Sequence, residues 1–191
     1  MGIIMSLAKT QSSQRSYMSK NEVTLKGKST LRAFERGAIR YWMDKGMELS
    51  EAINEAVKRG LCVHEQTVDN LVVTAGKQLL ADLLIDVETT GIAYHEFGTG
   101  ATAPGLADTA LTTASVRKAV TSKSRSGNQV LVSTFYLASE SAYAIKEAGI
   151  FGGSLASSTP GSGKMLCHYL QTYDNSAGMY DLTFEYALTI N

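Results

Sequence analysis

The strongest constraint on the fold is the regular alternation of residue types just before the C-terminus. Between Tyr180 and Ile190 every second residue is apolar, and the residues between them are mostly polar. Successive side chains of a β-strand point to opposite faces, so a period of two gives this segment one wholly apolar face. The pattern predicts a half-buried strand in an antiparallel sheet.

Further strand signals precede this segment, bounded by Gly, Ser, Asn and Pro. The turn residues at 126–128 and 174–178 tolerate the positive φ angles of tight hairpins. Six strands at this spacing indicate a sandwich or a barrel. The predicted strands are Ile92 to Phe97, Ser115 to Thr121, Gln129 to Leu137, Ala144 to Phe151, Met165 to Gln171 and Met179 to Ile190.

Helical signals dominate the earlier part of the chain. Ser29 or Thr30 can cap a helix that ends at Gly46, because its apolar residues recur at helical spacing: Leu31, Phe34, Ala38, Tyr41 and Trp42. A second helix is predicted from Ser50 to Gly60, completing a helical hairpin. Thr74 can cap a third helix, whose buried stripe would be Leu79, Leu80, Leu83 and Leu84.

The sequence therefore predicts an α+β protein, with an N-terminal helical hairpin followed by a mainly antiparallel β-sandwich. We expect three parts: a flexible arm over 1–28, the hairpin over 29–66 and the β domain with one leading helix over 67–191. The arm is assigned because 9–28 are polar and rich in Ser and Lys, without core-forming periodicity. Such an arm is expected to become ordered against a partner.

Charge is distributed unevenly along the 191 residues, although the formal net charge is zero. Residues 1–60 hold eleven Lys or Arg against six acids, and residues 61–191 hold seven against twelve. On the predicted first helix, Arg32, Arg36 and Arg40 recur at spacing four, as either a solvated face or a docking surface. The positive residues are too dilute to favour nucleic acid as a partner. No apolar run is long enough to predict membrane insertion.

Three apparent motifs do not carry a ligand site. Gly98 to Ala103 fits a dinucleotide-binding pattern, but no amphipathic helix follows it. Gly161 to Lys164 lacks the first Gly and the final Ser or Thr of a phosphate-binding loop. Cys62, His64, Cys167 and His168 reproduce no metal-site spacing, although a site built in space from Cys62, His64 and His168 stays conceivable. We expect no cofactor, no metal and no catalytic residue.

The order of several short motifs resembles a known family of proteins. These are VVTAGKQLLADLL, FGTGATAP, the stretch from Leu111 to Arg117, IKEAGIFG, GKMLCHYL and LTFEYALTI, which together cover about the last two thirds of the chain. Their order is similar to that of a small β domain in virion structural proteins of tailed bacteriophages, often in tail fibres or tail appendages.

The resemblance implies a non-enzymatic structural protein of the virion, made in the host cytoplasm. Gly98, Gly100 and Pro104 would shape a turn-rich crossing, and Glu147, Gly149 and Phe151 would form a tight junction. Arg117 is the expected partner of the Glu147 carboxylate, since a Glu in an apolar strand needs one.

The implied role is a fibre-attachment, connector or baseplate subunit that forms a homo-oligomer and contacts other tail proteins. Arg32, Arg36 and Arg40 are the candidate assembly interface. A capsid decoration or head-fibre protein is the alternative within this class, and a hydrolase of host envelope polysaccharide is the alternative from another class.

Overall fold

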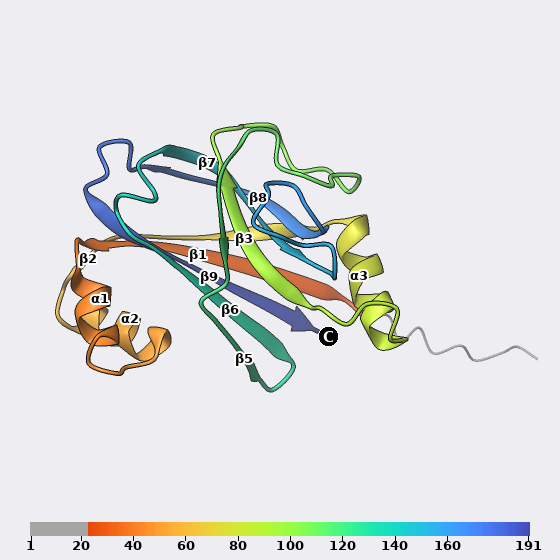
Figure 1. The fold of residues 1–191 in the computed structure, drawn as a ribbon, viewed down its shortest axis with the longest axis horizontal. Coiled ribbons are helices and arrows are strands. Elements are labelled where there is room, and N and C mark those ends of the chain that lie inside the picture. Colours follow the sequence, from red (N-terminus) through yellow and green to blue (C-terminus); the bar gives the residue numbers. More distant parts are fainter. Residues whose placement is uncertain (1–22) are drawn as a thin grey trace, which may run out of the picture.

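Nine antiparallel strands form one continuous sheet in the computed structural model, which describes residues 23–191 (Figure 1). Their order across the sheet is β4-β3-β7-β8-β2-β1-β9-β6-β5. The strands are β1 (Leu25–Glu35), β2 (Cys62–Val72), β3 (Ile92–Gly98), β4 (Ala114–Ala119), β5 (Ser122–Ser126), β6 (Gln129–Tyr136), β7 (Ala144–Gly152), β8 (Lys164–Asp174) and β9 (Tyr180–Ile190). The helices are α1 (Ala38–Met43), α2 (Leu49–Lys58) and α3 (Thr74–Leu84).

The sheet is curled into a half-barrel, and the connection between β4 and β5 shows how. These strands are neighbours in sequence but lie at opposite ends of the strand order. Between them, the N–H of Val120 donates to the Ala93 carbonyl of β3, and the N–H of Thr121 donates to the Ser133 carbonyl of β6. The two ends of the sheet therefore approach each other there. The predicted α+β fold with a two-sheet sandwich is wrong, because the described residues form mainly one curled antiparallel sheet that encloses its own core, with three small helices.

The alternating C-terminal segment occupies the middle of one half of this sheet. β9 pairs with β1 on one side and with β6 on the other. Leu182, Phe184, Tyr186 and Leu188 point into the core and are almost fully buried. Because β9 has neighbours on both sides, its apolar face lies inside the curl. The strand is antiparallel, as the alternation predicts.

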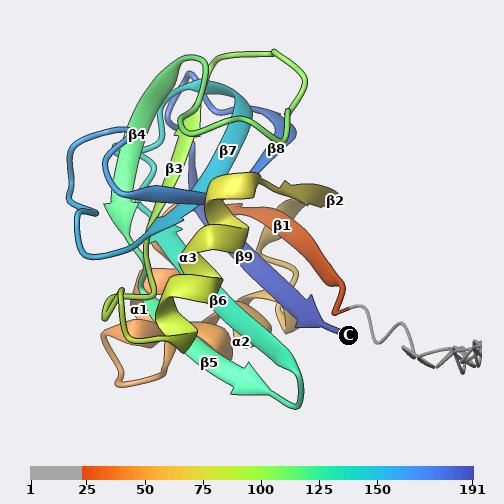
Figure 2. The same ribbon diagram turned by 90° about the vertical axis from the view of Figure 1, so that its right-hand side faces the viewer.

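Buried apolar side chains gather in three clusters. The main core fills the inside of the curl and joins β1, β6 and β9 to β3, β7 and β8. Helices α1 and α2 cover the outer face at one end of β1 and β6, where they pack around Phe34 and Phe135. Helix α3 lies at the other end of the molecule and follows β2 directly (Figure 2). Val73, at its start, packs against Phe151 and Met165.

The predicted N-terminal helical hairpin over 29–66 is wrong. Residues 29–35 belong to β1, which pairs with β9 along its whole length and with β2 from Gly27 to Phe34. Leu31 and Phe34 are both fully buried, but they lie on opposite faces of the strand and belong to different clusters. A strand buried on both faces can thus give apolar residues the spacing of a helix. Gly37, at φ 81°, then turns the chain into the short α1.

Other predicted elements coincide with observed ones. Helix α2 overlaps the predicted second helix but starts one residue earlier, and α3 starts at Thr74, although Leu84 is largely exposed rather than buried. The six predicted strands overlap β3, β4, β6, β7, β8 and β9. No separate pattern in the sequence predicted β5. Most of the predicted arm, residues 1–22, lies outside the described residues, and 25–28 belong to β1.

Candidate functional site

Glu147, in the middle of β7, organises the largest buried polar cluster of the described residues. Its side chain is fully buried. One oxygen, Oε1, accepts hydrogen bonds from the N–H groups of Gly100, at 3.1 Å, and Thr113, at 2.6 Å. The other, Oε2, accepts from the N–H of Thr112 at 3.0 Å. Hydrogen bonds from several backbone N–H groups offset the hydration that a carboxylate loses on burial. Because these donors belong to the loop between β3 and β4, Glu147 fixes that loop.

His168 of β8 extends this cluster to the surface. Its Nε2 lies 3.1 Å from Oε2 of Glu147, and its Nδ1 lies 2.7 Å from Oδ2 of Asp108. Asp108 also accepts a hydrogen bond from the N–H of Gly105. That bond and the nearby imidazole lower the pKa of Asp108. We call Glu147, His168 and Asp108 the carboxylate clasp. It holds both ends of the β3–β4 loop against the sheet.

The glycines of the FGTGATAP segment are required by this arrangement. A Cβ atom on Gly98 would lie 2.1 Å from the Thr113 carbonyl oxygen, and one on Gly100 would lie 2.3 Å from Oε1 of Glu147. Gly149 pairs with both Glu96 and His168, and a Cβ atom on it would lie 2.9 Å from the Cys167 carbonyl oxygen. Close backbone approach explains these glycines, and Pro104 lies in the loop that they anchor.

Arg117 does not pair with Glu147, so that sequence prediction is wrong. Its side chain is 1% exposed and donates to Oε2 of Glu96 at 2.6 Å, from the residue directly opposite in β3. It also donates to the Ser157 and Ser162 carbonyls and lies 4.3 Å from the ring centre of Phe151. Arg117 therefore joins β4 to β3 and to the loop before β8.

His95 is fully enclosed in the main core. Its Nδ1 lies 2.9 Å from the Tyr136 hydroxyl, its Nε2 lies 3.0 Å from the Tyr169 hydroxyl, and Phe184 packs against its ring. Burial lowers the pKa of His95 to about 3, so the imidazole is neutral at physiological pH. With both nitrogens held by tyrosines, His95 cross-links the two halves of the curl.

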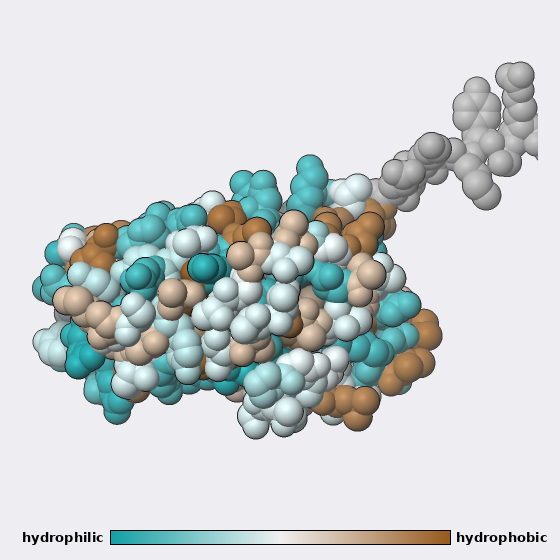
Figure 3. All heavy atoms as spheres, turned by 90° about the horizontal axis from the view of Figure 1, so that it is seen from above, coloured by the Kyte–Doolittle hydropathy of each residue, from teal (hydrophilic) through white to brown (hydrophobic). Residues whose placement is uncertain are grey.

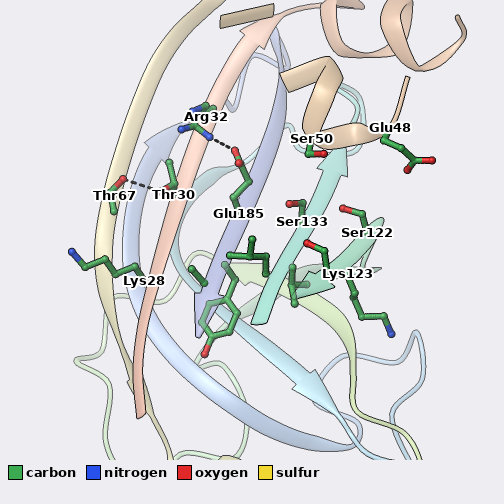
Figure 4. Close-up of a pocket in the computed structure, with 15 residues that line it drawn as sticks. Lys28, Thr30, Arg32, Glu48, Ser50, Thr67, Ser122, Lys123, Ser133 and Glu185 are labelled. Carbon is green, nitrogen blue, oxygen red and sulfur yellow. Dashed lines mark hydrogen bonds and ion pairs between the residues drawn. The ribbon is translucent and has the colours of Figure 1, made fainter. Parts of the chain in front are cut away.

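A groove of about 520 Å³ lies on the outer face of β1, β9, β6 and β5, beside the start of α2 (Figure 4). Its charged centre is Arg32, which donates to Glu185 of β9 and, at 2.6 Å, to Glu65 of β2. Hydroxyls of Thr30, Ser122 and Ser133 also line it. Because Arg32 is already paired with two carboxylates, the other polar groups of the groove include these hydroxyls and the side chains of Lys28, Lys123 and Glu48.

The three arginines predicted as one stripe are separated by the structure. Arg32 lies on β1 within the groove. Arg36 lies in the turn before α1 and donates to the Gly178 carbonyl at 2.5 Å. Arg40 lies on α1, where its Nε is 3.6 Å from Asp44 and its side chain is 60% exposed. They share no helix face, so the geometric basis of the predicted interface is absent.

Sequence reasoning missed several residues that fix the loops. Asp181 of β9 is fully buried and accepts from the N–H groups of Gly37 and Ala138, each at 2.7 Å. Glu88 accepts from the N–H of Ser154 and lies 3.0 Å from Lys164 Nζ. The available signal was a charged residue in an otherwise apolar pattern, as for His168 in GKMLCHYL and Asp181 in the last strand.

Within residues 23–191, no cluster of His, Cys, Asp or Glu has the geometry to hold a metal ion. Nor does this part of the chain contain a helix long and apolar enough to cross a membrane. No protein-family model, curated protein or solved structure matches the chain. Its function must therefore be argued from the sequence and the geometry alone.

Proposed function

We propose that this chain is a non-enzymatic structural subunit of a tailed-phage virion, acting as a fibre-attachment, connector or baseplate component. In this role it forms a homo-oligomer and contacts other tail or baseplate proteins. The proposal starts from the resemblance of the ordered motifs and is supported by how those motifs meet in space.

The carboxylate clasp is the observation that carries the proposal. It joins FGTGATAP through Gly100, IKEAGIFG through Glu147 and GKMLCHYL through His168. Three motifs that are separate in sequence thus form one structural unit. Every carboxylate oxygen of Glu147 is held by backbone N–H groups or by His168, which suits a group that fixes a loop.

Exposed hydrophobic side chains give a second line of support. Leu84, Ile85 and Val87 at the end of α3 are each more than 60% exposed, as is Val23 before β1. Figure 3 shows hydrophobic residues gathered at this end of the molecule. Exposed apolar side chains in one region are typical of contact surfaces between proteins.

The test is to locate and count the chain in purified virions by cryo-EM and quantitative mass spectrometry. We expect a fixed copy number that matches the symmetry of the tail. Absence from the particle, or a copy number that varies between preparations, would contradict the proposal.

An assay of the purified protein on host envelope polysaccharide provides the complementary test. We expect the polymer to keep its length, with a known polysaccharide hydrolase as the positive control. Cleavage by the purified chain, with products that grow in proportion to protein concentration, would favour the hydrolase instead.

A further inference from the structure

One long strand of the sheet has an edge that is open over most of its length. β2 pairs with β1 from Cys62 to Asn70 but with β8 only at Leu71 and Val72. The backbones of the two strands meet near α3 and separate toward the other end of the molecule (Figure 1). Beyond Leu71, β8 reaches β2 through side chains: Gln171 donates to the Gln66 carbonyl at 2.9 Å, and the Tyr173 ring stacks on His64. From Cys62 to Asn70, β2 is therefore an edge strand on its β8 side.

The hydrogen bonds around β1 show which backbone groups lie on this edge. The backbone of Thr24 exchanges hydrogen bonds with that of Asn191. The N–H and C=O groups of even-numbered residues of β1 therefore point to β9, and those of odd-numbered residues point to β2. In β2, the N–H and C=O groups of even-numbered residues point to β1, and those of odd-numbered residues point away from it. The N–H of Val73, which donates to the Leu166 carbonyl of β8, fits this alternation. The backbone groups of Val63, Glu65, Thr67 and Asp69 therefore point to the open edge.

These four edge residues are exposed, and side chains on the inner face of β2 also have polar atoms without hydrogen-bond partners. Within the described residues, the N–H and C=O groups of Val63, Glu65, Thr67 and Asp69 have no hydrogen-bond partner. On the inner face, four buried atoms likewise have none: His64 Nε2, Gln66 Oε1 and both amide atoms of Asn70. A strand added beside β2 would supply partners for the backbone groups on this edge.

The other open edge with suitable chemistry is β5, at the far end of the sheet. β5 and the start of β6 form a hairpin that projects from the body of the protein (Figures 1 and 2). Residues 123–126 are exposed. By the same alternation, Lys123 and Arg125 carry the backbone groups on the open edge, because Ile190 N donates to Asn128 and sets the register of β6.

We propose that the β5 edge of one copy pairs with the open β2 edge of a second copy, extending the sheet between subunits. The β2 edge carries Asp69 and Glu65, of which Glu65 is already paired with Arg32, whereas β5 carries Lys123 and Arg125, whose side chains contact only backbone carbonyls. Opposite charges across paired strands stabilise the pairing and like charges oppose it. Pairing of β2 with β2, or of β5 with β5, would place like charges together.

This contact joins two different surfaces, so it leaves one free edge of each kind on every dimer. Such a heterologous contact closes into a ring or continues as a filament. The inference rests on the proposed structural role and deepens it by naming the partner as a second copy and the contact as strand addition.

The backbone part of the proposal is tested in the full chain by Thr67→Pro, with Thr67→Ala as the matched control. Both variants lose the hydroxyl that lies 2.8 Å from the Thr30 hydroxyl. Only proline removes the N–H on the open edge, and it leaves the β1 ladder intact. In sedimentation velocity, we expect the wild type and Thr67→Ala to form dimers and larger species with rising concentration. Thr67→Pro should associate at least tenfold more weakly.

A charge exchange tests the partner strand without altering the backbone. Lys123→Glu and Asp69→Lys should each associate at least tenfold more weakly than the wild type, whereas their equimolar mixture should recover heterodimers. Circular dichroism verifies that each variant is folded. A wild type that stays monomeric to about 1 mM, a Thr67→Pro chain that associates like Thr67→Ala, or a mixture without recovery would overturn the inference. Virion copy number is measured separately, so the proposed function can stand or fall independently.

Discussion

Individual buried carboxylates fix the loops of this protein, and Glu147 is the clearest case. Replacing it with Gln keeps its size but removes the charge and turns an NH₂ group toward backbone donors. We expect Glu147→Gln to lower the free energy of unfolding by about 3 kcal/mol, because buried N–H groups would lose their acceptor. Urea unfolding measures the change, with Asp44→Asn as an exposed control expected within about 0.5 kcal/mol. A loss equal to that of the control would rule out the clasp as a stabilising feature.

Glu88 gives the protein a predictable response to acid. The N–H of Ser154 and the ammonium of Lys164 lower its pKa to about 2, from 4.5. A carboxyl whose pKa falls on folding stabilises the native state above its unfolded pKa. That contribution is lost as the pH drops from about 4.5 to about 2. We expect the melting temperature of Glu88→Gln to fall less than that of the wild type across this window. Parallel curves for the two proteins would contradict the assignment.

At the scale of elements, the position of Arg32 on β1, rather than on the predicted helix, changes the expected effect of reversing its charge. On an exposed helix, reversing its charge would leave the fold intact, but here Arg32 lies between Glu65 and Glu185. We expect Arg32→Glu to cost about 2 kcal/mol of stability, since it brings three carboxylates together. Arg40→Glu, on the exposed surface of α1, should cost about 0.5 kcal/mol or less. Chemical denaturation of both variants checks the contrast, and equal effects would show that the groove pairs contribute nothing.

The contact between α3 and β8 depends on a helix residue without a side chain. A Cβ atom on Gly76 would lie 2.2 Å from the Leu166 carbonyl oxygen, so the helix would have to move. We expect Gly76→Ala to destabilise the protein by about 2 kcal/mol, although Ala normally favours a helix. The control is Gly91→Ala, where the nearest atom would be 4.0 Å away. Thermal unfolding should show a lower melting temperature for the first variant alone.

The elements also show what the sequence can and cannot predict. β9 was predictable because only one of its faces is strongly apolar, which leaves a clean period of two. β1 was not, because it buries Leu31 on one face and Phe34 on the other. The need of Glu147 for a partner was evident, but its identity depends on register: Arg117 lies opposite Glu96 in the β3–β4 pair. Local patterns carry no information about such pairing between distant segments.

For the molecule as a whole, the last strand determines whether the rest can form. β9 separates β1 from β6, so its removal would leave both strands without their shared neighbour. We expect a chain that ends at Gly178 to lose its cooperative thermal transition and its near-ultraviolet circular dichroism. Removing residues 1–8, which precede the described part of the chain, should preserve both signals and serves as the control. A cooperative transition in the shorter chain would show that the sheet tolerates the gap.

The central place of β9 also determines when the protein can fold in the cell. Synthesis proceeds at about 5–20 residues per second, so roughly 8–31 seconds separate the appearance of β1 from that of its partner β9. During this time β1 can pair only with β2, and its other edge stays open to unrelated chains. Folding therefore cannot be completed before β9 has been synthesised, and many copies made at once on one messenger would expose the same unpaired edge together.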